Sequence, residues 1–237
     1  MAAIDFHTHI LPRIDDGSKN REMSIQMIAD TANAGIAYVV ATPHFYADQM
    51  RIHSFIERRD RAYRVIADDL DKAGIRMIPG AEVAYFSGMH RAEDLEKLCF
   101  GYGNTRIMML EMPFRAWTAN DLDEVEMLIR GGYHIMIAHL DRFYQFQTDK
   151  GMIPALMELP VTIQINAEAL LNHKTRGQML KLFKAGKAHV LGSDCHNITG
   201  RPQNIGVVRQ IIAEKYGNEK LKQIDRYGLE LFRKYKR

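Results

Sequence analysis

The stretch that decides the fold reads Asp5-Phe-His7-Thr-His9-Ile-Leu-Pro-Arg-Ile-Asp15-Asp16-Gly17, at the end of a short apolar run. Alternate residues of a β-strand point to the same face, so His7 and His9 can bind one cation together. Imidazole suits zinc, manganese, iron, nickel and copper, and nearby carboxylates favour the harder of these ions. A bare His-x-His pair also fits two structural histidines in a strand. The Asp-Asp-Gly turn that follows favours a metal site.

On both sides of this stretch, short apolar runs alternate with helical patterns. The expected strands cover residues 3–6, 36–41, 76–78, 107–110, 135–138, 161–165 and 189–191. The spacing of apolar residues predicts helices over 21–34, 55–73, 122–129, 176–186, 204–215 and 219–235. Ser18 or Asn20 is expected to cap the first of these helices, and Gly74 stands where a C-cap glycine ends the second.

Alternation of helices with continuous apolar strands predicts an α/β protein whose parallel sheet is covered by helices. Parallel α/β barrels usually close with eight strands, so the seven expected strands indicate a distorted seven-stranded (β/α)7 TIM-like barrel. We find no internal repeat, low-complexity segment or linker, and residues 1–237 are expected to form a single domain. Loops 43–53, 84–92 and 112–120 carry aromatic residues among polar ones, and we expect them to line a cleft.

Charge and cysteine content exclude several classes of protein. The formal net charge is +3 and the pI is about 8.8, too mild to indicate binding to nucleic acid or a membrane surface. Part of the excess lies in the basic segment 233–237, a solvated helix end or a functional tail. Cys99 and Cys195 are the two cysteines, and no signal-peptide pattern precedes the first expected strand, so we expect a cytoplasmic protein. No apolar run is long enough to span a membrane.

Six of the seven expected strands are followed at their carboxyl ends by an ionisable side chain. These side chains are His7, His9, His44, Glu82, Glu111, His139, Asp194 and His196. The carboxyl ends of parallel barrel strands converge on one rim, where the active site lies. Each residue alone would more often be structural, but burying several carboxylates is costly unless cations compensate them. The pattern predicts a metal cluster. Gln164 and Asn166, at the sixth strand, are not expected to be ligands.

The ordered motifs carry a resemblance to a known family. They are His-x-His, Asp-Asp-Gly, Thr-Pro-His, Gly-Ala-Glu, Leu-Glu, Ala-His-x-x-Arg and Ser-Asp-x-His, spread over residues 5–202. The series resembles the polymerase and histidinol phosphatase (PHP) superfamily. Within it, the chain is most similar to the bacterial manganese-dependent protein-tyrosine phosphatases of capsule and exopolysaccharide operons. Those enzymes have a distorted seven-stranded barrel, which the strand count here suits.

The resemblance implies three divalent cations, with manganese expected and iron or zinc as alternatives. It assigns the first cation to His7, His9, Glu82 and Asp194, the second to Glu82, Glu111 and His139, and the third to Asp16, His44 and His196. Asp141 stands where the relatives carry Glu, at a position that is not a ligand. Asp5 and Asp15 are expected to orient imidazoles, because metal-bound histidines commonly donate their other N–H to a carboxylate.

The implied reaction is hydrolysis of phosphotyrosine by a metal-activated hydroxide. Arg142, three residues after His139, and Arg201, five after His196, are expected to bind the phosphate with their guanidinium groups. The alternative for each arginine is a surface salt bridge. The resemblance also implies a phosphotyrosine-bearing protein partner, a bacterial tyrosine kinase that governs polysaccharide assembly.

Three other functions stay open at this point. The same metals could hydrolyse a small phosphoester such as histidinol phosphate or a nucleotide, or the barrel could bind a phosphorylated partner without turnover. Cys195-His-Asn-Ile-Thr-Gly-Arg201 also fits the C-x5-R spacing of cysteine-dependent tyrosine phosphatases. Pro202 replaces the Ser or Thr usual there, and Asp194 and His196 flank the cysteine, so its side chain should point away from the metal face.

Overall fold

The computed structural model describes residues 2–101 and 106–234, without the side chains of Arg233 and Lys234. The basic segment 233–237 therefore lies outside the described side chains. The strands are β1 (Ala3–Thr8), β2 (Ile36–Ala41), β3 (His44–Phe45), β4 (Arg76–Pro79), β5 (Glu82–Ala84), β6 (Ile107–Glu111), β7 (His134–Ile137), β8 (Thr162–Asn166) and β9 (Val190–Gly192). All their pairings are parallel, which confirms the α/β class and the parallel sheet.

The strands form two sheets, in the orders β1-β2-β4 and β3-β5-β6-β7-β8-β9. All seven expected runs contain strands, and the short strands β3 and β5, which the sequence pattern missed, follow β2 and β4 after brief breaks. Hydrogen bonding continues across the breaks, because Gly80 N donates to Ala41 O and Glu82 N donates to Pro43 O. On the other side, the segment after β9 bonds to β1 through Asp194 N and His7 O, 2.7 Å apart. Hydrogen bonds thus join the two sheets in two places, between the β2–β3 and β4–β5 segments and between β1 and the segment after β9.

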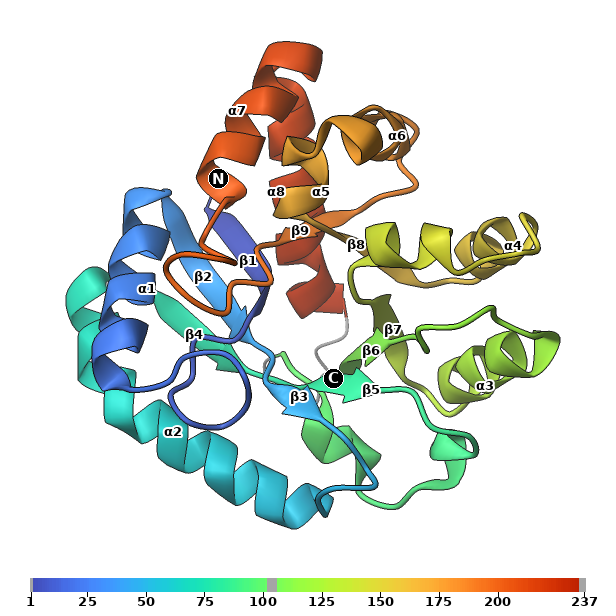
Figure 1. The fold of residues 1–237 in the computed structure, drawn as a ribbon, viewed down its shortest axis with the longest axis horizontal. Helices are drawn as coiled ribbons and strands as arrows, with labels where there is room; N and C mark the ends of the chain where they lie inside the picture. The colour runs from blue at the N-terminus through green and yellow to red at the C-terminus, as the bar shows by residue number, and fades with distance from the viewer. Residues whose placement is uncertain (1, 102–105, 235–237) are drawn as a thin grey trace.

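Helices surround the strands (Figure 1). They are α1 (Arg21–Asn33), α2 (Ile52–Ala73), α3 (Ala119–Arg130), α4 (Met152–Glu158), α5 (Ala167–Leu171), α6 (His173–Lys184), α7 (Ile205–Tyr216) and α8 (Asn218–Lys234), with short 3-10 turns at Met89–Arg91, Leu95–Leu98 and Leu140–Gln145. Asn20 caps α1 by accepting from Met23 N, and Gly74 ends α2 in the left-handed region, at φ 69°. The sequence pattern missed α4 and α5, which are too short for a clear helical period. None of the helices in these ranges is long and apolar enough to cross a membrane.

A separate apolar cluster fills the space that the strands enclose. Ile4 and Phe6 of β1, Val40 of β2 and Val190 of β9 belong to it, and Phe232 of α8 packs against them. The rings of Phe6 and Phe232 stack with centroids 5.8 Å apart. α8 passes behind β1 and β9 in Figure 1 and packs on both strands. This cluster closes the interior from the side of the strand amino ends and leaves the carboxyl ends to polar side chains.

An irregularity in β1 decides which of its side chains face the interior. Asp5 pairs with Val39 and Thr8 pairs with Ala41, so three steps along β1 match two along β2. Such a bulge reverses the alternation of side chains beyond it. Phe6 points into the interior cluster before the bulge, and His7 and His9 point inward after it. His7 and His9 share a face, as predicted, but Asp5 lies on the other face.

Candidate metal centre

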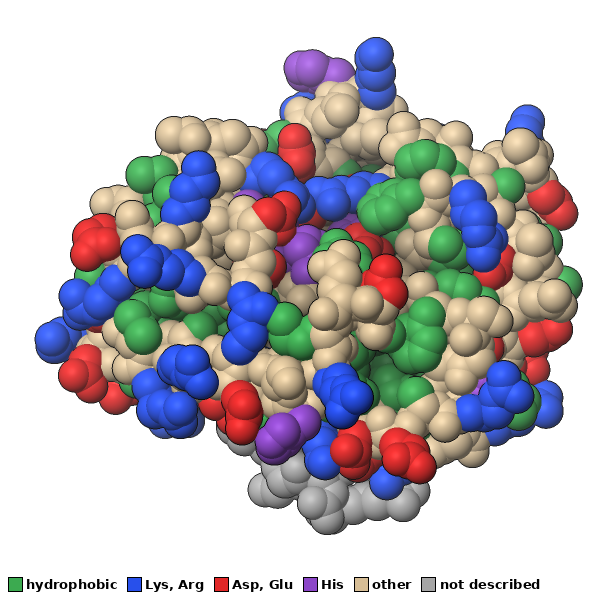
Figure 2. Space-filling model, turned by 60° about the horizontal axis from the view of Figure 1, so that its bottom comes forward, with side chains coloured by type: hydrophobic (Ala, Val, Ile, Leu, Met, Phe, Trp, Pro, Cys, Tyr) green, Lys and Arg blue, Asp and Glu red, His purple; other side chains and the backbone are tan. Residues whose placement is uncertain are grey.

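The carboxyl ends of the strands bring all nine predicted metal ligands together, in overlapping groups of donors. They come from β1 and the loop after it, from β3, β5 and β6, and from the segments after β7 and β9. Figure 2 shows histidine side chains at the bottom of a hollow flanked by basic and acidic side chains. Convergence of this kind is expected at the carboxyl rim of a parallel barrel.

The innermost donors are His7, His9, Glu82 and Asp194, all at most 2% exposed. The two Nε2 atoms of His7 and His9 lie 3.1 Å apart. Glu82 Oε2 lies 3.2 Å from His7 Nε2 and 3.4 Å from His9 Nε2. Asp194 Oδ1 lies 3.6 and 3.4 Å from the same two nitrogens. Two imidazole nitrogens and two carboxylate oxygens thus surround one small space, which is the donor set predicted for the first cation.

The second predicted set centres on His139. Its Nε2 lies 2.6 Å from Glu82 Oε1 and 3.3 Å from Glu111 Oε1. Glu82 therefore presents Oε2 to the innermost donors and Oε1 to His139. One carboxylate facing two donor sets is the arrangement expected of a bridging ligand.

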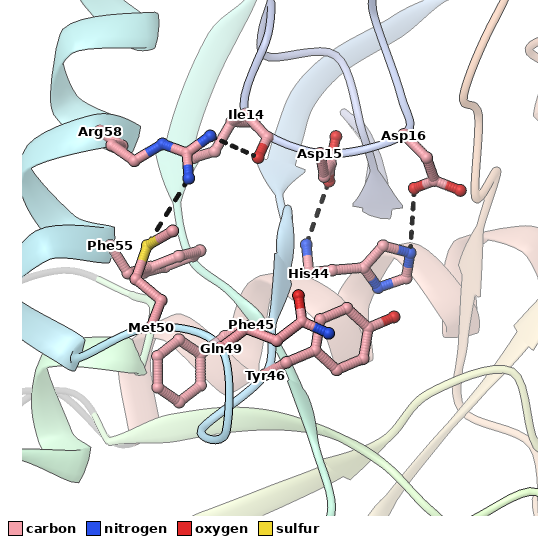
Figure 3. A pocket seen from close by; sticks show the side chains of 10 residues that line it. All are labelled: Ile14, Asp15, Asp16, His44, Phe45, Tyr46, Gln49, Met50, Phe55 and Arg58. Carbon is pink, nitrogen blue, oxygen red and sulfur yellow. Dashed lines mark hydrogen bonds and ion pairs between the residues drawn. The ribbon is translucent and has the colours of Figure 1, made fainter.

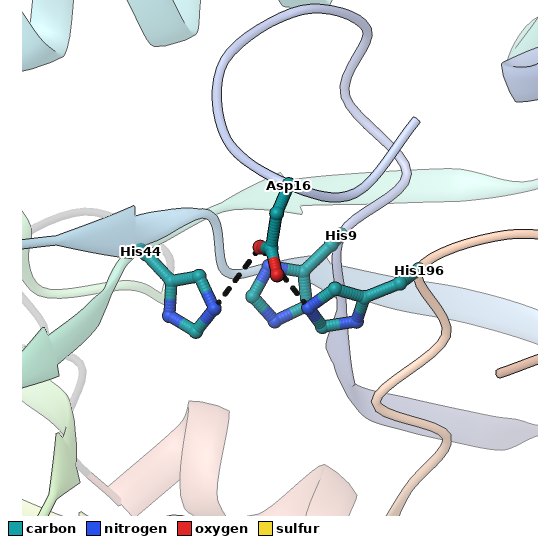
Figure 4. Close-up of side chains that lie close together, drawn as sticks. All are labelled: His9, Asp16, His44 and His196. Carbon is teal, nitrogen blue, oxygen red and sulfur yellow. Dashed lines mark ion pairs between the residues drawn. The ribbon is translucent and has the colours of Figure 1, made fainter. Parts of the chain in front are cut away.

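The third set lies toward solvent (Figure 4). Asp16 Oδ1 lies 3.3 Å from His44 Nε2 and 3.4 Å from His196 Nε2. His9 groups with these three residues as well, so it adjoins both the innermost and the outer set. The side chain of Asp16 is 68% exposed, in contrast to the buried donors beneath it.

Unsatisfied buried atoms show that these residues fit divalent cations. His44 Nδ1, Glu82 Oε2, His139 Nδ1, Asp194 Oδ1 and His196 Nε2 are buried without a hydrogen-bond partner among the described residues. His44 Nδ1 and Glu82 Oε2 lie 2.8 Å apart but are not aligned for a hydrogen bond. Buried polar groups are normally satisfied, and leaving one unpaired costs about 1–3 kcal/mol. Cations held between these atoms would compensate several of them at once.

The electrostatics of the centre follow from opposite charges packed together. Burial opposes ionisation of Glu82, yet His7, His139 and His44 hold the pKa of its carboxyl well below the usual range. Burial also opposes protonation of His139, but hydrogen bonds to Glu111 and Glu82 raise its pKa to about 10. The carboxyl of Glu82 is therefore ionised at neutral pH, which is the form of a carboxylate that binds metal.

Two of the predicted ligands have an unusual backbone conformation. His139 has φ 29° and Asp194 has φ 52°, in a region that residues other than glycine rarely adopt. Such strain persists where the surrounding structure enforces it and is concentrated at functional sites. Two glycines also allow close approach to the histidines. A Cβ on Gly17 would lie 2.5 Å from the Cβ of His9, and one on Gly192 would lie 2.5 Å from the Cβ of His7.

Residues behind the ligands fix the orientation of the imidazoles. Asp15 Oδ2 lies 2.7 Å from His9 Nδ1, which confirms the role predicted for Asp15. The same role was wrong for Asp5, because the bulge turns it away from the imidazoles. Its carboxylate accepts instead from the backbone N–H groups of His7 and Ser193.

The residue that sequence reasoning missed is Gln164 in β8. Its Oε1 lies 3.2 Å from His7 Nδ1 and accepts from His139 N at 2.6 Å. Asn166, two residues on, donates through Nδ2 to Asp194 Oδ2 at 2.8 Å. The signal was present, because two amides in an otherwise apolar strand are unusual. An amide beside carboxylates is not expected to bind a metal directly, so the sequence pattern does not by itself connect β8 with the centre.

Both predicted arginines reach the centre. Arg142 Nη2 and Arg201 Nη2 each lie 2.5 Å from Asp194 Oδ2. The two side chains are partly exposed, at 29% and 30%, so they lie at the border between the buried donors and solvent. Each guanidinium keeps further N–H donors for another anion.

Cys195 does not share this environment. It is buried, and its thiol donates to Asn197 O rather than toward the metal ligands. Burial raises the pKa of the thiol to about 12, so almost no thiolate exists at neutral pH. A nucleophilic cysteine needs a lowered pKa and access to substrate. The C-x5-R spacing is therefore a coincidence of sequence.

Aromatic rings and a cavity border the outer donors. Tyr46 stacks on His44 with centroids 5.4 Å apart, and Phe114, which is 48% exposed, stacks on His139 at 6.0 Å. A cavity of about 360 Å³ extends from Asp16 and His44 toward α2 (Figure 3). Of the three loops expected to line a cleft, 43–53 contributes His44, Tyr46 and Met50 to this cavity.

Comparison with known proteins agrees with this geometry. Residues 3–228 match the model of the family described as capsular polysaccharide synthesis, CpsB/CapC. The tyrosine-protein phosphatase CpsB of Streptococcus pneumoniae is 28% identical over 93% of this chain and 94% of its own length. The tyrosine-protein phosphatase YwqE of Bacillus subtilis is 26% identical over 91% of this chain and 86% of its own length.

Solved structures agree on the fold. A structure from crystallographic work on B. subtilis YwqE and S. pneumoniae CpsB, described as unique metal-dependent tyrosine phosphatases, superposes with a TM-score of 0.82. It is 23% identical, and the match covers 97% of this chain and 94% of that one. The phosphotriesterase homology protein of Escherichia coli gives a TM-score of 0.60 at 13% identity, with 98% of both chains covered. The resemblance seen in the motifs is confirmed: the chain belongs to the capsular polysaccharide synthesis CpsB/CapC family.

Proposed function

We propose that this chain is a metal-dependent protein-tyrosine phosphatase, a phosphoric monoester hydrolase that acts in capsule or exopolysaccharide synthesis. The observation that carries the proposal is the cluster of nine His, Asp and Glu donors at one end of the sheet, with buried atoms left unpaired. The family match and the tyrosine phosphatases among the relatives support the same activity.

We further propose three divalent cations, with manganese the expected ion. The three donor sets would hold one cation each, with Glu82 shared between the first and the second. When bound, such cations lower the pKa of a coordinated water and stabilise charge on phosphoryl oxygens. Asp15 and Gln164 would keep the imidazoles of His9 and His7 in the orientation that binding requires.

The remaining tasks fall to side chains around the ligands. Arg142 and Arg201 would contact the phosphate oxygens, because a planar guanidinium matches them with two N–H groups at once. Their contact with Asp194 fixes both guanidinium groups at the edge of the centre before substrate binds. Phenol has a pKa near 10, far below that of an aliphatic alcohol, so departure of the tyrosine oxygen needs little help from a proton donor.

Aromatic side chains would position the substrate ring. Tyr46 and Phe114 lie on different ligating histidines, and Phe114 is the more exposed of the two. Aromatic pairs favour offset or edge-to-face contacts with centroids about 4.5–7 Å apart. An aryl phosphate can make such contacts, whereas phosphoserine cannot.

The wider setting of the enzyme is also part of the proposal. We infer that residues 1–237 form one domain, a distorted seven-stranded barrel in which β2 with β3 and β4 with β5 each count as one strand. We propose a tyrosine-phosphorylated protein, such as a bacterial tyrosine kinase, as the partner. The location of the protein in the cytoplasm stays a prediction from its sequence.

One set of assays tests the activity and the metals together. Purified protein would be analysed for bound metal and assayed on a phosphotyrosyl peptide with manganese and with EDTA. We expect turnover with manganese, loss in EDTA and full activity in Cys195→Ser. Arg142→Ala should keep its metals but lose transition-state stabilisation of about 2–4 kcal/mol.

Two outcomes would contradict the proposal. A strong preference for histidinol phosphate over the phosphotyrosyl peptide would identify a small-molecule phosphatase. Full activity in EDTA that disappears in Cys195→Ser would identify a cysteine-dependent enzyme.

A further inference from the structure

The part of the cavity that extends beyond Asp16, His44 and Tyr46 has no role in the reaction described above. The cavity begins at Asp16 and His44 and ends at α2, where Phe55 and Arg58 border it (Figure 3). At about 360 Å³ it is large enough for an amino-acid side chain and part of its backbone. Because it opens directly beside the metal centre, it lies where residues flanking a bound phosphotyrosine would pass.

Part of the cavity wall is apolar. Ile14, Phe45 and Phe55 are buried, and the rings of Phe45 and Phe55 meet edge to face at 5.3 Å. Met50 covers part of the remaining wall. A wall of this kind favours the CH₂ groups of a ligand over polar groups that it cannot satisfy.

A cation borders the α2 side of the cavity. Arg58 Nη2 donates to Ile14 O at 3.3 Å, and Nη1 lies 3.8 Å from Met50 Sδ. Both partners are uncharged, and no residue in the described ranges forms an ion pair with Arg58. Arg21 and Arg59, by contrast, pair with Asp69 and Asp60. The exposed guanidinium of Arg58 therefore borders the cavity without an ion-pair partner among the described residues.

The acidic residues of the cavity do not supply that partner. Asp15 faces His9 Nδ1 and the backbone N–H of His44. Asp16 faces His44 and His196. Both carboxylates thus belong to the metal-centre side. The rest of the lining is apolar except for Tyr46, Gln49 and the cation of Arg58 on the α2 side.

Resting on the proposed function, we propose that this cavity is a specificity subsite for an acidic residue near the phosphotyrosine of the substrate polypeptide. The residue that fits best is glutamate. Its methylene groups would pack on Met50 and Phe55, and its carboxylate would pair with Arg58. Aspartate has a shorter stem and would leave more of the apolar wall uncovered. The subsite makes Arg58 a specificity residue that touches neither the phosphate nor the metals.

Reversing the charge on the enzyme and on the peptide tests the subsite. The full chain with manganese would be assayed on phosphotyrosyl peptides that carry Glu, Asp, Ala or Lys at each flanking position in turn, and on p-nitrophenyl phosphate. At one position we expect kcat/KM to be highest for Glu and lowest for Lys. Arg58→Glu should lower kcat/KM for the Glu peptide about tenfold, raise it for the Lys peptide and leave p-nitrophenyl phosphate unchanged.

Arg61→Glu is the matched control, because Arg61 is exposed on the same helix but does not border the cavity. If Arg58→Glu and Arg61→Glu change kcat/KM for the peptides equally, the effect comes from the overall charge of the enzyme and the subsite proposal is wrong. Equal kcat/KM for all peptides would also overturn it while leaving the phosphatase activity intact. If the wild-type chain hydrolyses neither substrate, the proposed function fails instead. Fluorescence anisotropy of the labelled peptides would then still decide whether Glu binds better than Lys and whether Arg58→Glu reverses that order.

Discussion

Histidines occur at both ends of the parallel strands, in opposite electrostatic settings. At the carboxyl ends, His139 faces the carboxylates of Glu82 and Glu111, and its pKa is raised to about 10. At the amino ends, His189 accepts from Ile163 N and stacks on Tyr227, and burial lowers its pKa to about 4. A cation that binds beside His139 must therefore displace the proton of its imidazole, whereas His189 is already neutral and accepts a backbone hydrogen bond.

The groups suited to chemistry and the groups that stabilise the fold therefore lie at different positions along the strands. The polar end holds donors with unpaired atoms, which cost stability unless cations occupy the space between them. The apolar interior next to it, built from residues such as Phe6 and Phe232, supplies the stability that allows this. Changes at the two ends should therefore have different consequences.

The largest effect should follow Glu82→Gln. Glu82 contacts His7, His9, His44 and His139, and the amide keeps its shape but removes its charge. We expect a loss of turnover well beyond the roughly 10- to 100-fold typical of residues behind metal ligands, together with lower metal content. Steady-state kinetics and metal analysis would measure both. The exposed Glu93→Gln is the control, and a Glu82→Gln variant with full activity would break the comparison.

Phe232→Ala should show the reverse behaviour. It removes a ring that packs on Phe6 and Phe100 inside the barrel. We expect the free energy of unfolding to fall by about 3 kcal/mol, as for other large-to-small core substitutions. Urea denaturation would measure the loss of stability. Metal analysis and steady-state kinetics of the folded protein should show that it keeps its metals and its turnover. Loss of metal in folded protein would contradict the separation of the two ends.

Gln164→Ala should give an intermediate effect at the polar end. Gln164 is not an expected ligand, but its Oε1 lies beside Nδ1 of His7 and orients that imidazole. The same oxygen accepts from the backbone N–H of His139, whose backbone is strained. We expect metal affinity or turnover to fall by about 10- to 100-fold. Gln164→Glu keeps an oxygen acceptor at the same place and should recover part of the loss. If the two variants behave alike, the hydrogen-bond role is wrong.

The smallest effect should come from pH acting on His189. Its folded pKa of about 4 lies below the usual 6.5, so the unfolded chain binds the proton more readily. The stability associated with neutral His189 is complete above pH 6.5 and is lost as the pH falls from 6.5 toward 4, by about 1–2 kcal/mol for a partly exposed ring. Urea denaturation would give the free energy of unfolding at pH 7 and at pH 5. The difference between these two values should be smaller in His189→Asn than in the wild type, because Oδ1 of the asparagine can replace Nδ1 as the acceptor. An unchanged difference would assign the pH dependence to other groups.

The sequence by itself determined the elements and the ligand types. Apolar periodicity located seven of the nine strands in the described residues and the long helices, because these signals are local. The placement of His, Asp and Glu after those runs predicted which side chains meet, since parallel strands end on one rim. Motif order was enough to predict the family and the proposed three-metal centre.

Only the tertiary structure decided how those side chains are supported. The bulge in β1 depends on pairing with β2, so the sequence alone put Asp5 behind an imidazole and missed that this role belongs to Gln164. β3 and β5 follow β2 and β4 in the chain but belong to the second sheet, and hydrogen bonds continue across the break between the two sheets. The cavity that ends at Arg58 joins residues from three separate segments, which only folding brings into contact. Local pattern therefore fixes which groups are available, and long-range pairing fixes which way each of them faces.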